Sequence, residues 1–556
     1  MNDSPNIAAR LSRMAALYPE NRAVVQCRRD RSGLMTYRHL TIAELDRDSD
    51  RLARGLVAMG VTPGTKLVLM VPPGLEFFAL AFAAFKAGAI VVLIDPGMGR
   101  SRIFDCLEEI KPDGFIGVPL VHVVRSLFRR KFPHSRFHVT VGRRWFWGGK
   151  TYRQLLNELN ERIELPAVAG TDSAAIIFTS GSTGPPKGVL YEHGMFNAQV
   201  EQLQSFFNIQ PGEVDLAAFP LFALFDAGMG VTSVIPDMNP TRPADVAPEN
   251  VLEPIREFQI TQAFGSPALW NRVGKYCVEQ GIKIPHLRRI ISAGAPLPLP
   301  ILKRMHAVLE DPQGDMFPPY GATESLPIAC ISGREMVGDI AELTVAGAGT
   351  CVGVPFSRID VRIIEISDAP IDSPDRMKHL PTGKIGEIAV RGPVVTREYY
   401  NRPEATRLAK ISGNGDVWHR VGDVGYFDEQ NRLWFCGRKA HIVYTELGPL
   451  YTEQCEPVFN EHPRVYRTAL VGVGPRGAQK PVLVVEPEPG SFPLTPAEHQ
   501  SFRDELKTIA DRYLLTRQIE TFLFHKSLPV DIRHNVKINR EQLAVWAASQ
   551  LKETSS

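Results

Sequence analysis

"IIFTSGSTGPPKG", residues 176 to 188, joins a run of apolar residues to a segment of Ser, Thr, Gly and Pro that contains one lysine. The pattern predicts a buried strand followed by a loop with a small and flexible backbone. Such a loop is either a plain surface connection or a phosphate cradle built from backbone N–H groups, hydroxyls and a cation. The side chains that would serve a cradle are Ser180, Ser182, Thr183 and Lys187.

The phosphate-binding loop of kinases and GTPases has a different pattern. It needs Gly, four residues, then Gly-Lys-Ser/Thr, whereas Pro186 stands five positions after Gly181 and Gly188 follows the lysine. Kinase-type and GTPase-type functions therefore lose their strongest support.

The chain around this loop alternates helical patterns with short β-rich runs from residue 50 to about 350, such as "KLVLMVP" and "RRIISAG". The alternation predicts parallel sheets covered by helices, with ligands at the carboxyl ends of the strands. After Val354 the pattern changes to shorter strands with tight turns, and the final stretch indicates a small α+β domain. The predicted fold class is α/β, with a large N-terminal domain of helix-covered β-sheets and a small β-rich subdomain over 1–437, and a small C-terminal domain over 438–556.

Length and composition are those of an ordinary globular protein. At 556 residues the chain is too long for one hydrophobic core, and a formal charge of +2 does not suggest a nucleic-acid partner. Seven scattered cysteines without a Cys-x-x-Cys spacing argue against a disulfide framework or a zinc site and fit a reducing cytoplasm. The N-terminus has the spacing of an amphipathic helix and not the pattern of a signal peptide, with Ile7, Leu11, Met14 and Leu17 on one face.

Two stretches bear on membranes. "FFALAFAAFKAGAIVVLIDP", from Phe77, is interrupted by Lys86 and Gly88, so it predicts a short buried helix and a buried strand, not a membrane span. The segment from Arg125 to Lys150 is basic and aromatic, with "RSLFRRKFPHSRF" and "GRRWFWGGK". It is either a solvated face or a site of peripheral docking to a membrane surface, an oily substrate carrier or a partner enzyme.

Further motifs lie far from the loop in sequence. "PPYGATES" places Thr323 and Glu324 after a turn, and "HRVGDVGYFDEQNRLWFCGRK" sets Asp423 and Arg438 on strand ends. Each motif alone is weak, because an acid in a turn is more often a cap than a ligand. Together, in this order and spacing, they resemble the adenylate-forming superfamily of acyl-CoA synthetases and peptide-synthetase adenylation domains. The resemblance covers nearly the whole chain and implies an enzyme that uses ATP and Mg²⁺ to join AMP to a carboxylate.

The resemblance implies a role for each motif. Glu324 would be the Mg²⁺ ligand, a hard oxygen suited to that ion, and Thr323 would bond the α-phosphate. Asp423 would accept the ribose hydroxyls, and Arg438 would steady ribose or phosphate. The loop around the β- and γ-phosphates would comprise Thr179, Ser180, Gly181, Ser182, Thr183, Gly184 and Lys187. The adenine would be enclosed by Gly294, Ala295, Pro296, Tyr320 and Gly321.

The acyl pocket and the hinge show departures from the family pattern. Candidate walls of the pocket are Trp270 and the segment "FPLFALFDAG", with Phe222, Ala223 and Phe225. Many family members carry a histidine after Pro-Leu-Phe, and Ala223 at that position suits an apolar acyl group. The hinge residue, commonly Asp or Lys, is Ala440, and "GPLYTEQCE" departs from the region that forms the thiol tunnel in acyl-CoA synthetases. This divergence puts transfer to CoA in doubt.

The family's C-terminal lysine loop appears as "LPVDIRHNVKINRE", with the lysine two positions late and no glycine before it. By resemblance, Lys537 is the charge that stabilises the transition state, carried into the site by a mobile C-terminal domain. Arg533 is its nearest competitor, and a plain surface lysine is the alternative reading.

These variant C-terminal signatures resemble the β-lactone synthetases of bacterial long-chain olefin biosynthesis. Such enzymes adenylate a long-chain 2-alkyl-3-hydroxyalkanoic acid and let its own 3-hydroxyl displace AMP. A base must take the hydroxyl proton, and His193 is the candidate, against a structural histidine. The resemblance also suggests the reductase and the β-lactone decarboxylase of the same pathway as partners in a multi-enzyme assembly.

Two alternatives stay open. One is a long-chain acyl-CoA or acyl-AMP ligase, which shares the adenylation motifs. The other is a catalytically silent ATP-binding scaffold, which is disfavoured because Lys187, Glu324, Asp423 and a C-terminal lysine are all present.

Overall fold

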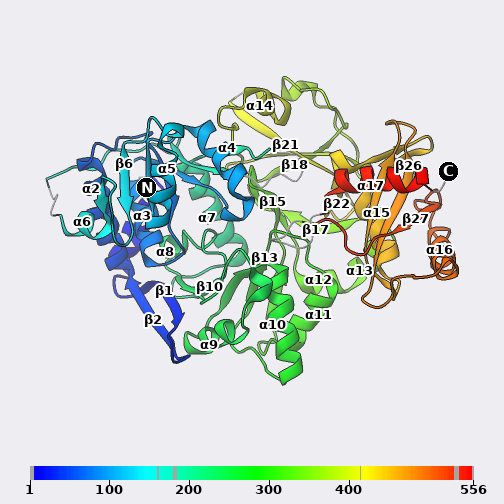
Figure 1. The fold of residues 1–556 in the computed structure, drawn as a ribbon, viewed down its shortest axis with the longest axis horizontal. Coiled ribbons are helices and arrows are strands. Elements are labelled where there is room, and N and C mark those ends of the chain that lie inside the picture. The colour runs from blue at the N-terminus through cyan, green and yellow to red at the C-terminus, as the bar shows by residue number, and fades with distance from the viewer. Residues whose placement is uncertain (1–5, 159–161, 179–184, 414, 531–537, 554–556) are drawn as a thin grey trace.

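The computed structural model describes residues 6–158, 162–178, 185–413, 415–530 and 538–553. Its larger part is built around two seven-stranded β-sheets (Figure 1). The first sheet contains the strand that precedes the glycine-rich loop. All its neighbouring strands are parallel except the last pair. In spatial order its strands are β7 (Lys150–Thr151), β6 (Phe137–Thr140), β5 (Gly114–Gly117), β3 (Lys66–Met70), β4 (Ile90–Leu93), β8 (Ser173–Phe178) and β9 (Gly188–Glu192).

The second sheet is also parallel apart from an antiparallel hairpin at one edge. In spatial order its strands are β14 (Asp315–Phe317), β13 (Arg289–Ser292), β12 (Gln262–Gly265), β10 (Val214–Ala217), β11 (Thr232–Ile235), β1 (Arg22–Arg29) and β2 (Met35–Thr41). Alternation of short strands and helices in the sequence predicts such sheets, because parallel neighbours need a crossover connection between them.

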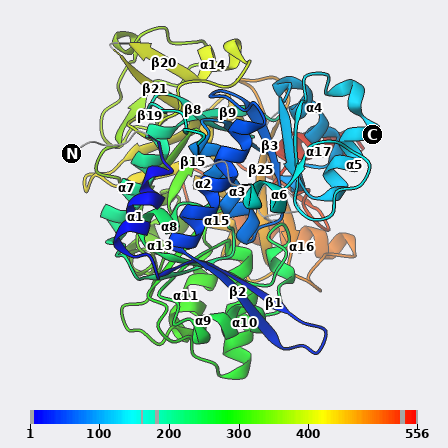
Figure 2. The same cartoon turned by 90° about the vertical axis from the view of Figure 1, so that its left-hand side faces the viewer.

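Helices pack on both faces of these sheets (Figure 2). Helix α3 (Leu75–Lys86) is buried along its whole length in the core that both sheets share. The apolar run from Phe77 therefore divides into a buried helix and the buried strand β4, as predicted. Among the described residues, no helix is both long and apolar enough to cross a membrane. The other helices up to residue 345 are α1 (Ala9–Leu17), α2 (Ile42–Ala58), α4 (Arg100–Ile110), α5 (Pro119–Leu127), α6 (Tyr152–Asn157), α7 (His193–Phe207), α8 (Asp226–Met229), α9 (Glu249–Glu257), α10 (Pro267–Gln280), α11 (Leu299–Val308), α12 (Gly333–Val337) and α13 (Asp339–Val345).

A third, antiparallel sheet follows these two, in agreement with the predicted β-rich subdomain. Helix α14 (Pro403–Ala409) packs against it. Its strands are β15 (Tyr320–Ala322), β16 (Ser325–Cys330), β17 (Thr350–Pro355), β22 (Leu433–Arg438), β21 (Asp416–Phe427), β19 (Gly386–Arg391) and β18 (Asp360–Ile364), with β20 (Lys410–Gly413) paired to β21.

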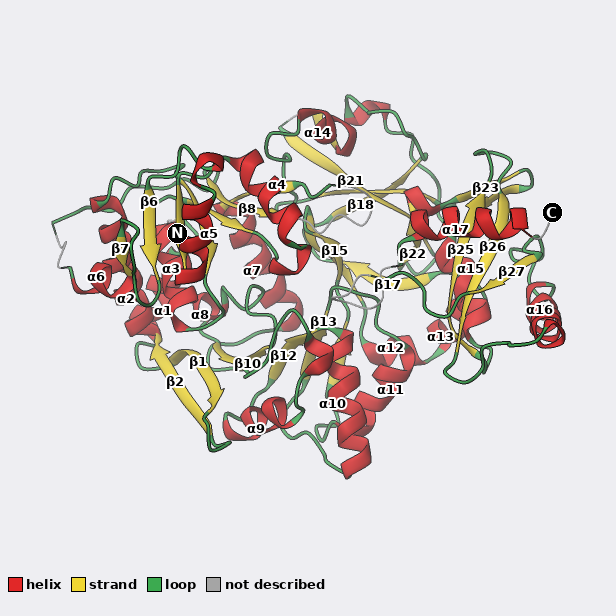
Figure 3. Cartoon of the chain, in the orientation of Figure 1, coloured by secondary structure: helices red, strands yellow, loops and turns green. Residues whose placement is uncertain are grey.

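The chain after Arg438 builds a three-stranded sheet, β25-β26-β27, and a separate two-stranded sheet, β23-β24, with helices around them (Figure 3). Two hydrophobic clusters lie on the three-stranded sheet, one under α15 and α16 and one under α17. The elements are β23 (Val443–Thr445), β24 (Gly448–Leu450), α15 (Thr452–Asn460), β25 (Val465–Val473), β26 (Lys480–Pro487), α16 (Pro496–Ala510), β27 (Thr521–Phe524) and α17 (Arg540–Glu553). Motion of this part as a body stays a prediction.

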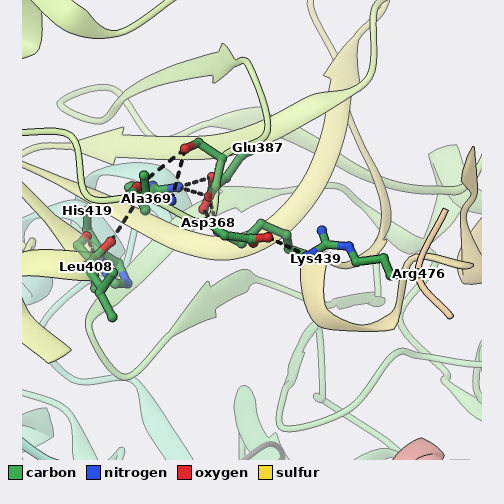
Figure 4. A network of polar contacts seen from close by, with 10 residues as sticks. Asp368, Ala369, Glu387, Leu408, His419, Lys439 and Arg476 are labelled. Carbon is green, nitrogen blue, oxygen red and sulfur yellow. Dashed lines mark hydrogen bonds and ion pairs between the residues drawn. The ribbon is translucent and has the colours of Figure 1, made fainter. Parts of the chain in front are cut away.

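A network of buried charges lies where the chain passes from β22 into the C-terminal part (Figure 4). Glu387 of β19 accepts a hydrogen bond at 2.6 Å from Arg420 and one at 3.0 Å from Lys439, and the side chains of Arg420 and Glu387 are only 2% and 1% exposed. On the surface nearby, Arg476 between β25 and β26 pairs with Asp368 at 2.5 Å. One buried carboxylate thus compensates two cations, one of which begins the connection to the C-terminal part.

Glu387→Ala is expected to destabilise the protein by about 3–5 kcal/mol, because it leaves the buried Arg420 without a counter-ion. Chemical unfolding followed by circular dichroism measures the change. Asp372→Ala is the control, since it removes an exposed partner of Arg376 at 3.5 Å. That pair should contribute less than about 1 kcal/mol. Equal unfolding free energies for the two variants would contradict the role given to Glu387.

Candidate active site

A cavity of about 1820 Å³ opens at the carboxyl ends of the parallel strands. Its lining includes Met70, Leu93 and Phe178, which are the last residues of β3, β4 and β8. Residues of the third sheet line it as well, and so do Ile538 and Arg540 from the C-terminal part. Strand ends of this kind are where open parallel sheets bind ligands.

Thr323 and Glu324 form the two-residue turn of the hairpin between β15 and β16, and both line the cavity. The backbone of this turn is held from two sides. The hydroxyl of Tyr191 in β9 donates to the Thr323 carbonyl. The N–H and hydroxyl of Thr396 donate to the Glu324 carbonyl at 2.9 and 3.1 Å. Because both carbonyls are fixed, the two side chains have a defined place in the cavity wall.

The carboxylate of Glu324 is oriented by a tyrosine that the sequence motifs did not indicate. The hydroxyl of Tyr399 donates to Glu324 Oε1 at 2.6 Å, which leaves the second carboxylate oxygen for another ligand. Lys187 Nζ lies 4.9 Å from the centroid of the Tyr399 ring and also lines the cavity. The structure therefore brings the predicted Mg²⁺ ligand and the lysine of the glycine-rich loop to one tyrosine.

A buried lysine lies behind this group. Lys410 donates to Thr396 Oγ1 at 3.1 Å, and its Nζ is 5.9 Å from the centroid of the Tyr399 ring. Burial lowers the pKa of Lys410 to about 7, while the charge of Glu324 opposes that shift. Lys410 thus supports Thr396 and, through it, the Glu324 carbonyl.

Three residues predicted to contact the nucleotide come together on the third sheet. Asp423 lies inside β21 and not at a strand end as predicted, directly opposite Arg438, the last residue of β22. Its Oδ2 accepts a hydrogen bond from the Tyr320 hydroxyl at 2.6 Å, and its Oδ1 lies 2.9 Å from Arg438 Nη1. Oδ1 is therefore paired with the Arg438 guanidinium. Burial raises the pKa of Asp423, and Arg438 counters this effect. A carboxylate fixed in this way at a cavity wall can still accept hydrogen bonds from the hydroxyls of a ribose, because each of its oxygens has more than one acceptor site.

The predicted adenine-binding residues also line the cavity: Gly294, Ala295, Pro296, Tyr320 and Gly321. Gly294 has φ +94°, in the left-handed region that other residues rarely adopt. This glycine lets the chain turn sharply after β13, so that the segment that follows can face the third sheet.

The predicted acyl wall is present in part. Phe222, Ala223 and Phe225 line the cavity, and Phe222 stacks on Phe264 with the ring centroids 4.4 Å apart. Trp270 does not belong to this wall. It is fully buried in the core on the other side of the second sheet, because the apolar stripe of α10 faces the strands.

His193 is placed away from the reaction cavity, contrary to its predicted role as a base. It is the first residue of α7, fully buried, with its ring edge-on to Phe85 at 5.8 Å between centroids. Its Nδ1 accepts a hydrogen bond from the Ile7 N–H at 3.4 Å. Burial lowers the pKa of His193 to about 4. This placement favours a structural role for His193.

A pair of buried carboxyl groups lines the cavity instead, and no sequence motif indicated it. Asp215 of β10 and Asp226 of α8 hydrogen-bond to each other, and Ser233 donates to Asp226 Oδ2 at 2.7 Å. Gln262 also lines the cavity beside Asp215, and Arg289 donates to its Oε1 at 2.6 Å. Burial raises the pKa of Asp226 to about 7. It raises the pKa of Asp215 as well, with the charge of Asp226 as a second cause.

Two predicted parts of the site lie outside the described residues. They are the glycine-rich loop, Thr179, Ser180, Gly181, Ser182, Thr183 and Gly184, and the C-terminal segment with Lys537 and Arg533. The described residues that flank them, Phe178, Lys187 and Ile538, all line the cavity.

Known proteins match nearly the whole length of the chain. A family profile described as "AMP-binding enzyme" matches residues 11–400. The chain is 48% identical to an olefin beta-lactone synthetase of Xanthomonas campestris over 554 residues, which covers 98% of each chain. It is 47% identical to an olefin beta-lactone synthetase of Stenotrophomonas maltophilia over 100% of both chains. Among solved structures, o-succinylbenzoate CoA synthetase from Bacillus subtilis in complex with ATP and magnesium superposes with a TM-score of 0.72 at 22% identity and covers 96% of this chain and 98% of its own. The predicted α/β fold, with its small C-terminal domain, is confirmed.

Tyr399→Phe tests the orientation of Glu324. The variant loses a hydrogen bond to a charged oxygen, worth about 1.5–3 kcal/mol, so ATP–pyrophosphate exchange should fall on the order of tenfold or more and need more Mg²⁺. Tyr400→Phe is the matched control, because its hydroxyl accepts from Lys66 at 3.2 Å and does not contact Glu324. An unchanged Mg²⁺ dependence in Tyr399→Phe would refute the assignment.

Proposed function

Because the chain belongs to the family of AMP-binding enzymes, we propose that it is an ATP-dependent olefin β-lactone synthetase. It adenylates a long-chain 2-alkyl-3-hydroxyalkanoic acid and closes the acyl adenylate to a β-lactone, with release of AMP and pyrophosphate. The observation that carries this proposal is the full-length match to two olefin β-lactone synthetases. The apolar Phe222–Phe225 wall supports it, because it lines the same cavity as Glu324, Asp423 and Arg438.

In the first half-reaction, a carboxylate oxygen of the acid attacks the α-phosphorus of ATP and pyrophosphate leaves. Asp423 and Arg438 hold the ribose, and the loop from Thr179 to Lys187 surrounds the leaving phosphates. Glu324, whose Oε1 is fixed by Tyr399, has the oxygen chemistry that suits Mg²⁺. An Mg²⁺ ion held there would supply positive charge that offsets the negative charge of the phosphates. Lys537 contributes positive charge to the transition state.

In the second half-reaction, the 3-hydroxyl oxygen attacks the acyl carbon, and the bond from that carbon to the AMP oxygen breaks. The nucleophile is tethered to the electrophile, which gives the large advantage of an intramolecular reaction. Water must be excluded, because hydrolysis of the adenylate competes with closure of a strained ring. The apolar wall of Phe222, Ala223 and Phe225 serves this end.

The hydroxyl proton needs an acceptor, and the Asp215–Asp226 pair replaces His193 in that role. The pair lines the cavity and shares one proton, so its ionised oxygen can take a hydrogen bond and then a proton from the substrate. Asp226 follows the Phe222–Phe225 wall directly in sequence, and its raised pKa suits a base that works near neutral pH. The other charged groups around the pair, Arg289 and Glu213, already pair with each other at 2.9 Å.

A long-chain acyl-CoA or acyl-AMP ligase is the alternative function. It would share the adenylation half-reaction and differ in the nucleophile. The divergent segment "GPLYTEQCE" argues against it, because Glu453 is buried at the cavity wall and accepts a hydrogen bond from Thr350 at 3.3 Å. A buried carboxylate in that place is a poor lining for the path of a thiol that must ionise to react.

The chemistry of the substrate and the product indicates which reactions come before and after this one. A reductase supplies the 3-hydroxyl group, and a β-lactone decarboxylase consumes the product. We place the chain with these two enzymes in the cytoplasm, in line with its seven free and buried cysteines.

Product analysis tests the function directly. With ATP, Mg²⁺ and a 2-alkyl-3-hydroxy acid, mass spectrometry should find β-lactone, AMP and pyrophosphate in equal amounts, with or without CoA. Lys537→Ala should lower pyrophosphate release on the order of a hundredfold, in the range measured for loss of one preorganised charge or donor. Formation of acyl-CoA alone, or of free acid and AMP alone, would favour the ligase.

Asp226→Asn tests the base. Lactone formation should fall at least about a hundredfold, as expected for loss of a general base, while ATP–pyrophosphate exchange with an acid that lacks the 3-hydroxyl changes little. Burial raises the carboxyl pKa, so the pair is protonated at low pH and ionised at high pH. The wild-type lactone rate should therefore rise with pH and level off above about 7, and this rise should be absent in the variant.

Asp315→Asn is the matched control, since Asp315 is a buried aspartate on β14 of the same sheet that bonds His306 at 2.6 Å. Asp315 is not among the cavity-lining residues. Equal loss of exchange and lactone formation in Asp226→Asn would mean a structural role for the pair.

A further inference from the structure

The segment around α5 carries an unusual concentration of positive charge. From Gly114 to Lys150 there are eight Lys and Arg residues and no Asp or Glu, although the whole chain has a formal charge of only +2. The rest of the chain is therefore at −6, by subtraction of +8 from +2. The described structure gives Arg129, Arg130 and Arg143 no ion-pair partner among the residues it covers, whereas Lys131 pairs with Glu108.

Large apolar side chains are exposed in the same segment. Leu120 and Leu127 of α5 are 70% and 75% exposed, and Phe128, which follows the helix, is 44% exposed. Trp145 and Phe146, in the loop before β7, are 58% and 74% exposed. We call these five apolar residues, with Arg129, Arg130, Arg143 and Arg144, the α5 face.

The α5 face is presented by an anchored scaffold. Trp147 is buried, stacks on His122 of α5 with ring centroids 5.5 Å apart, and donates to Thr140 Oγ1 at 2.9 Å. Trp145 and Phe146 pack on Trp147 with ring centroids 5.6 and 5.1 Å apart, so this anchor fixes their position. At the other end of the helix, Phe128 packs on Phe104 of α4 with centroids 4.9 Å apart.

The α5 face is continuous with the reaction cavity. Leu120, Leu127 and Phe128 line the same cavity as Ala223 and Thr323. An apolar path therefore extends from the adenylation site to an exposed apolar and basic surface. A substrate with two long alkyl chains is poorly soluble in water and partitions into lipid.

We propose that the α5 face docks the protein on an anionic lipid surface, from which the alkyl chains of the substrate enter the cavity. This goes beyond the proposed function and rests on it only for the identity of the lipid-soluble substrate. Exposed tryptophan, phenylalanine and leucine insert at the lipid interface, while the arginines meet the anionic headgroups. Charge complementarity favours this occupant over a second copy of the chain, because the same face on a partner would bring like charges together.

Vesicle flotation tests the proposal with the full chain. Vesicles of phosphatidylcholine alone and vesicles that also contain phosphatidylglycerol are compared at low and high salt. The wild type should float with the anionic vesicles, and binding should weaken as salt screens the charges. Arg129→Gln with Arg130→Gln should lower the partition coefficient on the order of tenfold or more, because each basic side chain near an anionic surface contributes about fivefold.

Trp145→Ser with Phe146→Ser should lower binding to a similar extent, and neither residue lines the cavity. The matched control is Leu494→Ser with Leu514→Ser, which removes two leucines that are 83% and 75% exposed in the C-terminal part. The control should float like the wild type. ATP–pyrophosphate exchange with a short, soluble acid should be the same in all variants, which separates docking from adenylation.

Absence of wild-type binding to anionic vesicles would overturn the proposal, and so would equal binding by the wild type and both α5-face variants. Self-association in analytical ultracentrifugation that is lost in Trp145→Ser with Phe146→Ser, without vesicle binding, would assign the face to a second copy. A wild type that binds vesicles and yields no lactone would refute the function and leave the docking surface in place.

Discussion

The site depends on one hairpin turn whose two carbonyl groups are both held. Thr323 and Glu324 occupy the turn between β15 and β16, and hydrogen bonds from Tyr191 in β9 of the first sheet and from Thr396 in the segment after β19 fix its backbone. A two-residue turn alone would let the Glu324 carboxylate sample several orientations. Here Tyr399 selects one of them. Precise placement of a charged ligand on rigid elements is what phosphoryl and adenylyl transfer need, because such catalysis is mostly positioning and electrostatics.

Burial decides how the charged groups around this turn behave. Burial raises the pKa values of Asp423, Asp215 and Asp226 and lowers that of Lys410. Each shift follows from the low polarity of the buried surroundings, which disfavours the charged form of the group. The same low polarity protects a reactive adenylate from water, so one physical condition serves both the tuned charges and the ring closure.

Short motifs in a fixed order predict that the hairpin acid, the loop lysine and the paired Asp423 and Arg438 belong to one site. The structure brings all four to one cavity, and their chemical roles stay predictions. The sequence does not mark Tyr399, Lys410, Asp215 or Asp226. Tyr399 reaches Glu324 across 75 residues, and no motif spacing distinguishes the other three from surface residues of the same types. Trp270 was assigned to the cavity wrongly. The sequence places it on α10 but does not say which face of that helix meets the sheet, and His193 failed for the same reason.

The central claim is that the carboxylate is activated and the hydroxyl attacks, and isotope transfer tests it most directly. A 2-alkyl-3-hydroxy acid labelled with ¹⁸O in both carboxylate oxygens is converted in a single turnover, and the products are weighed by mass spectrometry. The account predicts one ¹⁸O atom in AMP and one in the carbonyl of the lactone, with the ring oxygen unlabelled. Two ¹⁸O atoms in the lactone and none in AMP would contradict it, because that result requires activation of the hydroxyl and attack by the carboxylate.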